Sequence, residues 1–233
     1  MTMYSWTWWT RSTQGLLARI AIGAAIFAVL ATVDLVRHGK KATRWREYLF
    51  LVAGVVLACG YGIINDQITS RISWEYFYYG KGLADVLGSR IPPDSKALAW
   101  VVVKVAIEAT WTAGLIVSVA LLIANNPRSN RPRLPYRTLL SQFGFIALIA
   151  VCCSIILGIV GYLGGLTWIS SDFRWLVHEN LMRPSHFMCV FGIHLGAYLG
   201  GALGTIISIW RLVARRKRLG GNPVLFTQQP HKG

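Results

Sequence analysis

Two pairs of side chains that could do chemistry lie inside long apolar runs. Lys104 and Glu108 are four residues apart, as are His194 and Tyr198, so on a helix each pair shares one face. An ionised group at the centre of a membrane helix costs about 2.5–3.5 kcal/mol on insertion scales, and such residues commonly mark a ligand site or a proton relay. Two interpretations of Lys104 and Glu108 stay open: a salt bridge within one helix, or part of a binding site.

A third group of candidates lies in the stretch 60–80, where acids, amides and an arginine alternate with aromatic rings. Asp66 and Glu75 supply carboxylates, and Arg71 lies between them as an ion-pair partner for either. We expect an apolar span to end just before Asp66, which would place these residues in a connection. This connection is either a lid over a ligand or an interfacial turn anchored by its aromatic side chains.

The spacing of these residues gives little support to metal or catalytic chemistry. Asp66, Glu75, Glu108, His186 and His194 are suitable ligand types for a metal, but no pair has a recognised ligand spacing. Haem held by two histidines needs them on facing helices, and only His194 lies well inside a span. No serine stands in a nucleophile-elbow pattern, and all four cysteines lie in apolar runs. We therefore assign no metal ligand, cofactor or catalytic residue.

The composition indicates which kind of element positions these side chains. Of the 233 residues 54% are hydrophobic and 14% are charged, and the mean hydropathy is +0.47. Soluble domains carry about 25% charged residues, so this chain is expected to span a membrane several times. The net charge of +15 does not indicate nucleic-acid binding, because the basic residues lie in short connections between apolar runs.

The apolar runs predict an all-α membrane protein with a single transmembrane domain over residues 1–218. A disordered cytoplasmic tail is expected to follow at 219–233, where glycine, proline and glutamine are frequent. Five spans are expected at about 16–36, 48–64, 97–124, 139–166 and 186–213.

Charge alternates between successive connections and predicts the orientation. Basic residues concentrate at 37–46, 125–138 and 211–218. The remaining connections carry Asp66, Glu75, Asp85, Asp94, Asp172 and Glu179. Because basic connections stay in the cytoplasm, we expect the N-terminus outside and the C-terminus inside, with the stretch 60–80 facing outward.

Small residues predict how the last span packs. Gly192, Gly196, Gly200 and Gly204 recur every four residues and form a face that allows close approach of another helix, either the fourth span or another membrane subunit. His194 and Tyr198 point away from this face. Since their depth matches that of the Lys104–Glu108 pair, all four side chains could meet in one polar pocket in the outer half of the membrane.

The stretch that begins at Tyr61 also resembles a known motif. Tyr61-Gly-x3-Asp66-Gln-Ile-Thr-x-Arg71-Ile-x2-Glu75-Tyr-Phe-x2-Gly80 is similar to a motif in a family of uncharacterised multi-pass bacterial membrane proteins. The resemblance implies a location in the bacterial inner membrane but no activity. That family often has histidine where this chain has Asn65 and Lys81, which argues against a metal site in the motif.

Three functional hypotheses follow from these patterns. The first is a protein that binds or transports a small solute, ion or proton at an outward-facing polar pocket. The second is a non-enzymatic accessory or assembly subunit that contacts the lipid bilayer and other membrane subunits through its glycine faces. The third is a membrane-embedded enzyme with Glu108 or His194 as a base, which we favour less.

Overall fold

Five long helices make up most of the computed structural model, which describes residues 13–39, 42, 44–126, 131–168 and 181–220. The described residues form helices and no strand. The helices are α2 (Thr13–His38), α3 (Trp45–Ile72), the π-helix η2 (Tyr76–Gly80), the short α4 (Ala84–Leu87), α5 (Ser95–Ala124), α6 (Tyr136–Tyr162) and α8 (Pro184–Gly220). Asp172, Glu179 and residues 221–233 of the expected tail lie outside the described residues.

The five predicted apolar spans are confirmed as helices, and each is long and apolar enough to cross a membrane. α5 starts where expected, because the Asp94 carboxylate accepts hydrogen bonds from the backbone N–H groups of Lys96 (3.0 Å) and Ala97 (2.9 Å). This architecture is typical of a multi-pass membrane protein.

Three helix ends differ from the prediction. α3 continues to Ile72, well past the expected end at Ile64, because Asp66 and Thr69 are buried in the bundle and do not form a connection. α6 ends at Tyr162, before the expected Leu166, where Gly164 takes a φ of 85° that favours glycine. α8 runs beyond Val213 to Gly220 despite its basic residues.

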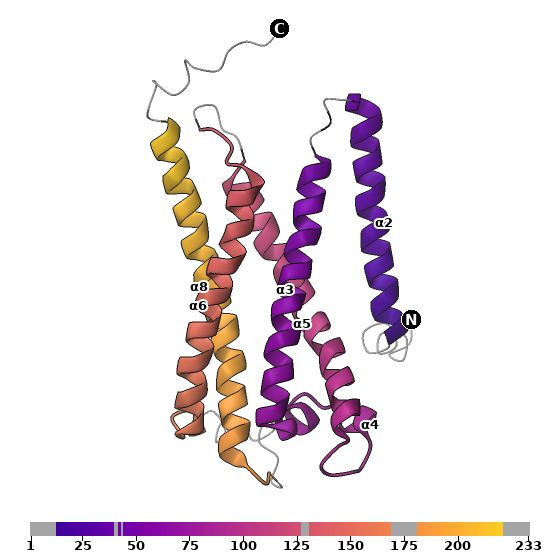
Figure 1. Cartoon of the computed structure of the whole chain (residues 1–233), viewed down its shortest axis with the longest axis vertical. Coiled ribbons are helices and arrows are strands. Elements are labelled where there is room, and N and C mark those ends of the chain that lie inside the picture. Colours follow the sequence, from indigo (N-terminus) through magenta and orange to yellow (C-terminus); the bar gives the residue numbers. More distant parts are fainter. Residues whose placement is uncertain (1–12, 40–41, 43, 127–130, 169–180, 221–233) are drawn as a thin grey trace.

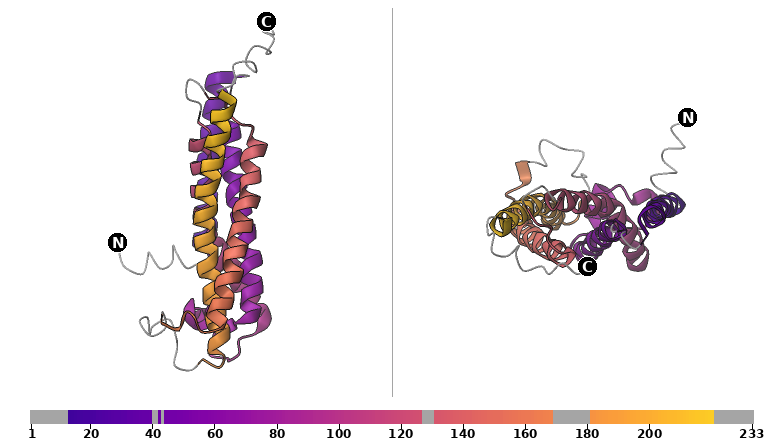
Figure 2. Two further views of the ribbon diagram at one scale, coloured as in Figure 1. Left: turned by 90° about the vertical axis from the view of Figure 1, so that its left-hand side faces the viewer. Right: turned by 90° about the horizontal axis from the view of Figure 1, so that it is seen from above.

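The helices are arranged as two closely packed pairs and one separate helix. α6 packs along α8, α3 packs along α5, and the contacts between these pairs are much sparser (Figure 1). α2 lies at one edge of the molecule and contacts mainly α3 (Figure 2). The two pairs are therefore the main packing units of the described helices.

Glycines explain the close packing of α8 on α6. A Cβ atom added at Gly192 would lie 2.1 Å from the carbonyl oxygen of Leu157, and one added at Gly196 would lie 2.4 Å from that of Cys153. Gly200 and Gly204 meet the backbone of α6 in the same way. The four glycines thus contact the fourth span, one of the two partners expected from the sequence.

Candidate functional site

Asp66 of α3 and His194 of α8 face each other inside the bundle, near the end where α3 finishes and α8 begins. Their side chains are 7% and 6% exposed, and 3.8 Å separates Oδ1 of Asp66 from Nε2 of His194. A lone buried charge would be costly, but a carboxyl and an imidazole side by side are neutral overall, either as an ion pair or as two uncharged groups. The structure thus brings together two of the predicted site residues.

The buried face of α3 places Asp66 in this position. Gly62 and Asp66 are both buried and lie about one turn apart on the same side of the helix, which faces its neighbours. A Cβ at Gly62 would lie 2.6 Å from a Thr110 methyl carbon, so the chain approaches α5 closely just before Asp66. Asp66 is therefore the polar continuation of a packing face.

The π-helix η2 covers the other side of His194. Its backbone forms hydrogen bonds between residues five apart, such as Lys81 N–H to the Tyr76 carbonyl (2.9 Å), a geometry often found at functional sites. The Tyr76 ring stacks on the imidazole at a centroid distance of 4.8 Å, and Phe77 meets it edge-on at 5.9 Å. Burial raises the pKa of the Tyr76 phenol, so this ring stays uncharged beside the histidine.

Thr69 and Asn65 connect the pair to a cleft. The Thr69 hydroxyl lies 3.4 Å from Nε2 of His194, and the Asn65 side-chain amide donates to Oδ1 of Asp66 (3.3 Å). Thr69 also donates to the Asn65 carbonyl oxygen (2.9 Å), which fixes the orientation of the hydroxyl. Both residues line the cleft, so a group bound there would reach Asp66 and His194 through them.

The cleft lies between α3, α6 and α8 and has a volume of about 410 Å³. Small-molecule sites span about 300–1,000 Å³. Most of its lining is apolar and comes from isoleucines such as Ile155 and Ile193. The buried hydroxyls of Tyr61 and Ser154 interact with each other, and neither forms a hydrogen bond with any other group in the part of the chain that the structure describes. The site therefore fits an apolar body that carries a hydrogen-bonding group.

Glu75 has a structural role in this geometry. It is 2% exposed, and its carboxylate accepts hydrogen bonds from the backbone N–H groups of Met182 and Arg183, just before the first residue of α8. A carboxylate is favourable there because the N-terminal end of a helix carries unpaired N–H groups and a partial positive charge. Glu75 therefore fixes the start of the helix that carries His194.

Glu108 pairs with a residue that the sequence did not indicate. One of its carboxylate oxygens lies 3.3 Å from Nη2 of Arg19 on α2, and both side chains are about a quarter exposed. Val102 and Ala106 form the buried face of α5, and Lys104 and Glu108 are turned away from it by about 200°. The structure thus does not bring Glu108 to His194, and the single shared pocket expected from depth alone does not form.

The other two predicted site residues are exposed. Tyr198 is 54% exposed on the outer surface of α8. Arg71 donates to the carbonyl oxygen of Gln67 (2.7 Å) in its own helix, and among the described residues it forms no ion pair with Asp66 or Glu75.

Sequence reasoning missed Tyr61, Asn65, Thr69 and Ser154. A sequence pattern indicates three of them, because Tyr61, Asn65 and Thr69 are polar residues spaced by four and so share one face of α3. This shared face is not apparent when the helix is predicted to end at Ile64, because Asn65 and Thr69 then lie outside the helix. Ser154 carries no comparable signal in its apolar helix.

Within the described ranges, no group of three or more His, Cys, Asp or Glu side chains is placed to hold a metal ion. A scan against protein-family models, a search of curated proteins and a search of solved structures found no match to this chain.

Proposed function

We propose that this protein is a membrane-embedded binding protein that holds a small, largely apolar molecule in the cleft between α3, α6 and α8. The observation that carries the proposal is the buried Asp66–His194 pair, which Thr69 and Asn65 connect to the cleft. The hydrogen-bonding group of the ligand would contact Thr69 and Asn65, and the pair behind them would take up or release a proton.

The ligand chemistry follows from the lining. Isoleucine side chains offer no hydrogen bonds, so the body of the ligand is apolar. The hydroxyls of Tyr61 and Ser154, which otherwise interact only with each other, keep donor and acceptor capacity that an oxygen or nitrogen of the ligand would use. This modifies the hypothesis of a polar solute, because only one end of the site is polar.

The orientation of the protein belongs to the same proposal. The positive-inside rule supports an external N-terminus and a cytoplasmic C-terminus, which puts the Asp66–His194 pair in the outer half of a bacterial inner membrane. Binding of the ligand from the outer leaflet or from outside the cell is then the direct route.

The test is the occupancy of the site in protein purified from its native membrane, measured by native mass spectrometry. His194→Phe keeps the ring that stacks on Tyr76 but removes both nitrogens. We expect it to lower occupancy by a co-purifying small molecule by up to about tenfold, because it removes the imidazole that contacts the Thr69 hydroxyl at the cleft, and a neutral hydrogen bond is worth about 0.5–1.5 kcal/mol. Thr69→Val should act in the same direction.

His186→Phe is the matched control, because His186 is on the same helix, contacts Tyr162 and does not line the cleft. Its occupancy should equal that of the unchanged protein. Equal occupancy in His194→Phe and His186→Phe would show that the Asp66–His194 pair has no part in binding.

One observation favours an accessory subunit as a second candidate. α2 packs sparsely on the rest of the molecule and exposes apolar side chains on several sides, among them Ile20, Ile26 and Leu35. The glycine face of α8 is occupied by α6, so a partner subunit would bind at α2 instead. Photo-crosslinking from position 26 in native membranes should then capture one defined partner, whereas a lone monomer argues against this role.

A further inference from the structure

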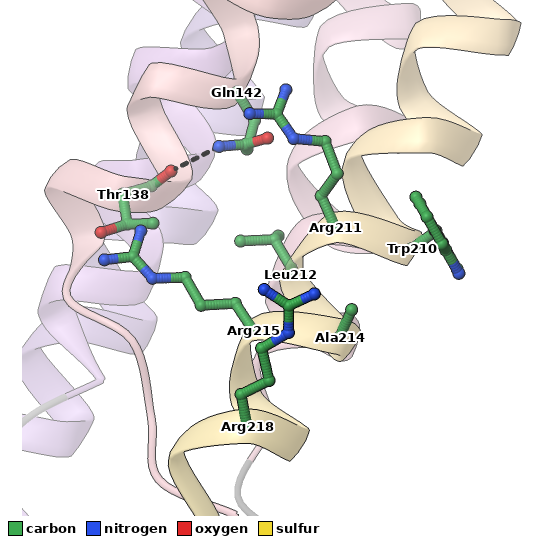
Figure 3. A pocket seen from close by; sticks show the side chains of 8 residues that line it. All are labelled: Thr138, Gln142, Trp210, Arg211, Leu212, Ala214, Arg215 and Arg218. Atoms are coloured by element: carbon green, nitrogen blue, oxygen red, sulfur yellow. Dashed lines mark hydrogen bonds between the residues drawn. The ribbon is translucent and has the colours of Figure 1, made fainter.

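A basic cleft, whose lining residues Figure 3 shows, lies near the C-terminal end of α8. His194 lies far from it, in the first third of the same helix. It has a volume of about 420 Å³ and is formed by α6 and α8. Arg211, Arg215 and Arg218 line it from α8, and Thr138 and Gln142 line it from α6. No acidic residue is among the residues that line it.

The three arginines share one face of α8, because they are spaced by four and three residues. All three are exposed, and none forms an ion pair with a carboxylate of the described residues. The Arg211 guanidinium lies over the Phe145 ring at 4.2 Å, which fixes its position at the edge of the cleft. Clustered guanidinium groups of this kind are suited to a phosphate.

Gln142 adds an independent observation. Gln142 is 8% exposed, and its side-chain amide nitrogen donates a hydrogen bond to the Thr138 carbonyl oxygen at 3.1 Å. Its side-chain oxygen is buried and has no hydrogen-bond partner among the described residues. A buried acceptor without a partner costs about as much as a lost hydrogen bond. A ligand that places a hydroxyl in the cleft would satisfy this oxygen.

The cleft is held in place by a different arginine. Arg216 is 5% exposed and faces the interior, where its guanidinium donates to the carbonyl oxygens of Pro132 (3.0 Å) and Asn126 (2.7 Å). It also donates to the last carbonyl of α5, at Ala124. These bonds attach the end of α8, which carries the three arginines of the cleft, to the end of α5 and to the connection that leads into α6.

Trp210 indicates that the occupant belongs to the membrane. Its indole is 70% exposed and lines the cleft one residue before Arg211. Exposed tryptophan between an apolar span and a basic helix end is typical of the headgroup level of a bilayer. A lipid that lies along the apolar part of α8 would present its phosphate at the height of the arginines.

We propose that this cleft binds an anionic phospholipid with a hydroxylated headgroup, of the phosphatidylglycerol type. The arginines bind the phosphodiester, and a headgroup hydroxyl donates to the side-chain oxygen of Gln142. The ligand is thus distinguished from phosphatidic acid, whose phosphate carries no alcohol group, and from phosphatidylcholine, which has no hydroxyl and no net charge.

The test uses the purified full-length chain in a mild detergent and native mass spectrometry to count bound lipids. Phosphatidylglycerol, phosphatidic acid and phosphatidylcholine with identical acyl chains are titrated in turn. We expect phosphatidylglycerol to bind about tenfold more tightly than phosphatidylcholine, or about 1.4 kcal/mol. Equal affinities for these two lipids would overturn the proposal.

Arg215→Gln is expected to lower the affinity for phosphatidylglycerol about tenfold, because it removes a charged hydrogen bond to the phosphate. Lys217→Gln removes the same charge from the same helix but does not line the cleft, and should change the affinity by less than about twofold. Equal losses in the two variants would show general attraction by positive charge and overturn the site. Arg218→Gln repeats the test if Arg215→Gln fails to fold.

Two further arms identify the ligand. Gln142→Met should abolish the preference for phosphatidylglycerol over phosphatidic acid, and an unchanged preference would overturn the assignment of the hydroxyl. Inorganic phosphate and glycerol 3-phosphate should not displace the lipid. Displacement by either would show that the cleft is a site for a soluble phosphate.

Discussion

At the scale of single residues, the buried ionisable side chains differ in their partners, which separates those beside the cleft from one that fixes a helix end. Asp66 and His194 are buried against each other beside a cleft, whereas Glu75 is buried against backbone N–H groups. Each carboxylate is costly to remove from water, and each is compensated differently. A substitution should therefore affect binding at Asp66 and stability at Glu75.

Replacing Glu75 tests this distinction. Glu75→Gln loses the charge and turns an amide group toward one of the two N–H donors, so the free energy of unfolding should fall by about 1–3 kcal/mol. Thermal unfolding of the purified protein in detergent measures this loss of stability. Asp85→Asn, at an exposed carboxylate of α4, is the control and should leave the melting temperature unchanged. Equal melting temperatures in both variants would refute the role of Glu75.

The ion pair between Arg19 and Glu108 gives a second prediction at this scale. Since either single change leaves a partly buried charge without its partner, Arg19→Gln combined with Glu108→Gln should destabilise less than the sum of the single changes. We expect a coupling energy of about 0.5–3 kcal/mol in a double-mutant cycle of thermal stability.

The pair Glu47–Arg133 provides the comparison, because it is longer (3.5 Å) and more exposed. Its coupling should be at most about 1 kcal/mol. Strictly additive effects of Arg19→Gln and Glu108→Gln would show that the pair does not attach α2 to α5.

At the scale of helices, the sequence predicts existence and type well but predicts ends poorly. The five apolar runs are unambiguous, because about 20 apolar residues suffice to cross a bilayer as a helix. The predicted end of α3 is wrong, because polar residues after Ile64 are typical of a connection. In the structure Asp66 and Thr69 are buried by neighbours that are distant in the sequence. The pairing of Asp66 with His194 was unpredictable for the same reason.

Glycine spacing predicts helix contacts more directly than charge does. The repeat of four in α8 predicts close approach, and the added Cβ distances show where it occurs. In contrast, the matched depths of Glu108 and His194 say nothing about which way each side chain faces.

Gly196→Ala tests the packing of α8 on α6. Its Cβ would lie 2.4 Å from a backbone oxygen, which cannot move away as a flexible side chain would. We expect a loss of about 1–3 kcal/mol in the free energy of unfolding from overpacking. Gly201→Ala in the same helix meets nothing within 4 Å and should be neutral or stabilising by up to about 1 kcal/mol. Similar melting temperatures for the two variants would contradict this packing.

At the scale of the whole molecule, two helix pairs meet loosely and leave a cleft between them. The sparse contacts between the α3–α5 and α6–α8 pairs permit a ligand to occupy space that a tighter bundle would fill. The basic cleft lies near the C-terminal end of α8, so the proposed ligand site and the proposed lipid site are separated along the bundle.

Reporter fusions test the proposed orientation. A green fluorescent protein fused after Gly233 should fluoresce, because it folds only in the cytoplasm, and alkaline phosphatase inserted after Leu87 should be active outside. Activity of the phosphatase at the C-terminus would reverse the orientation and place the Asp66–His194 pair on the cytoplasmic side.

The most direct test of the central claim fills the cleft with a larger side chain. Ile155 lines the cleft, and its neighbour Ile156 does not, although both are more than half exposed on α6. Native mass spectrometry of protein purified from its own membrane should show a bound small molecule in the unchanged protein and in Ile156→Trp. Ile155→Trp should lose it. Equal occupancy in the two variants would contradict a ligand in this cleft.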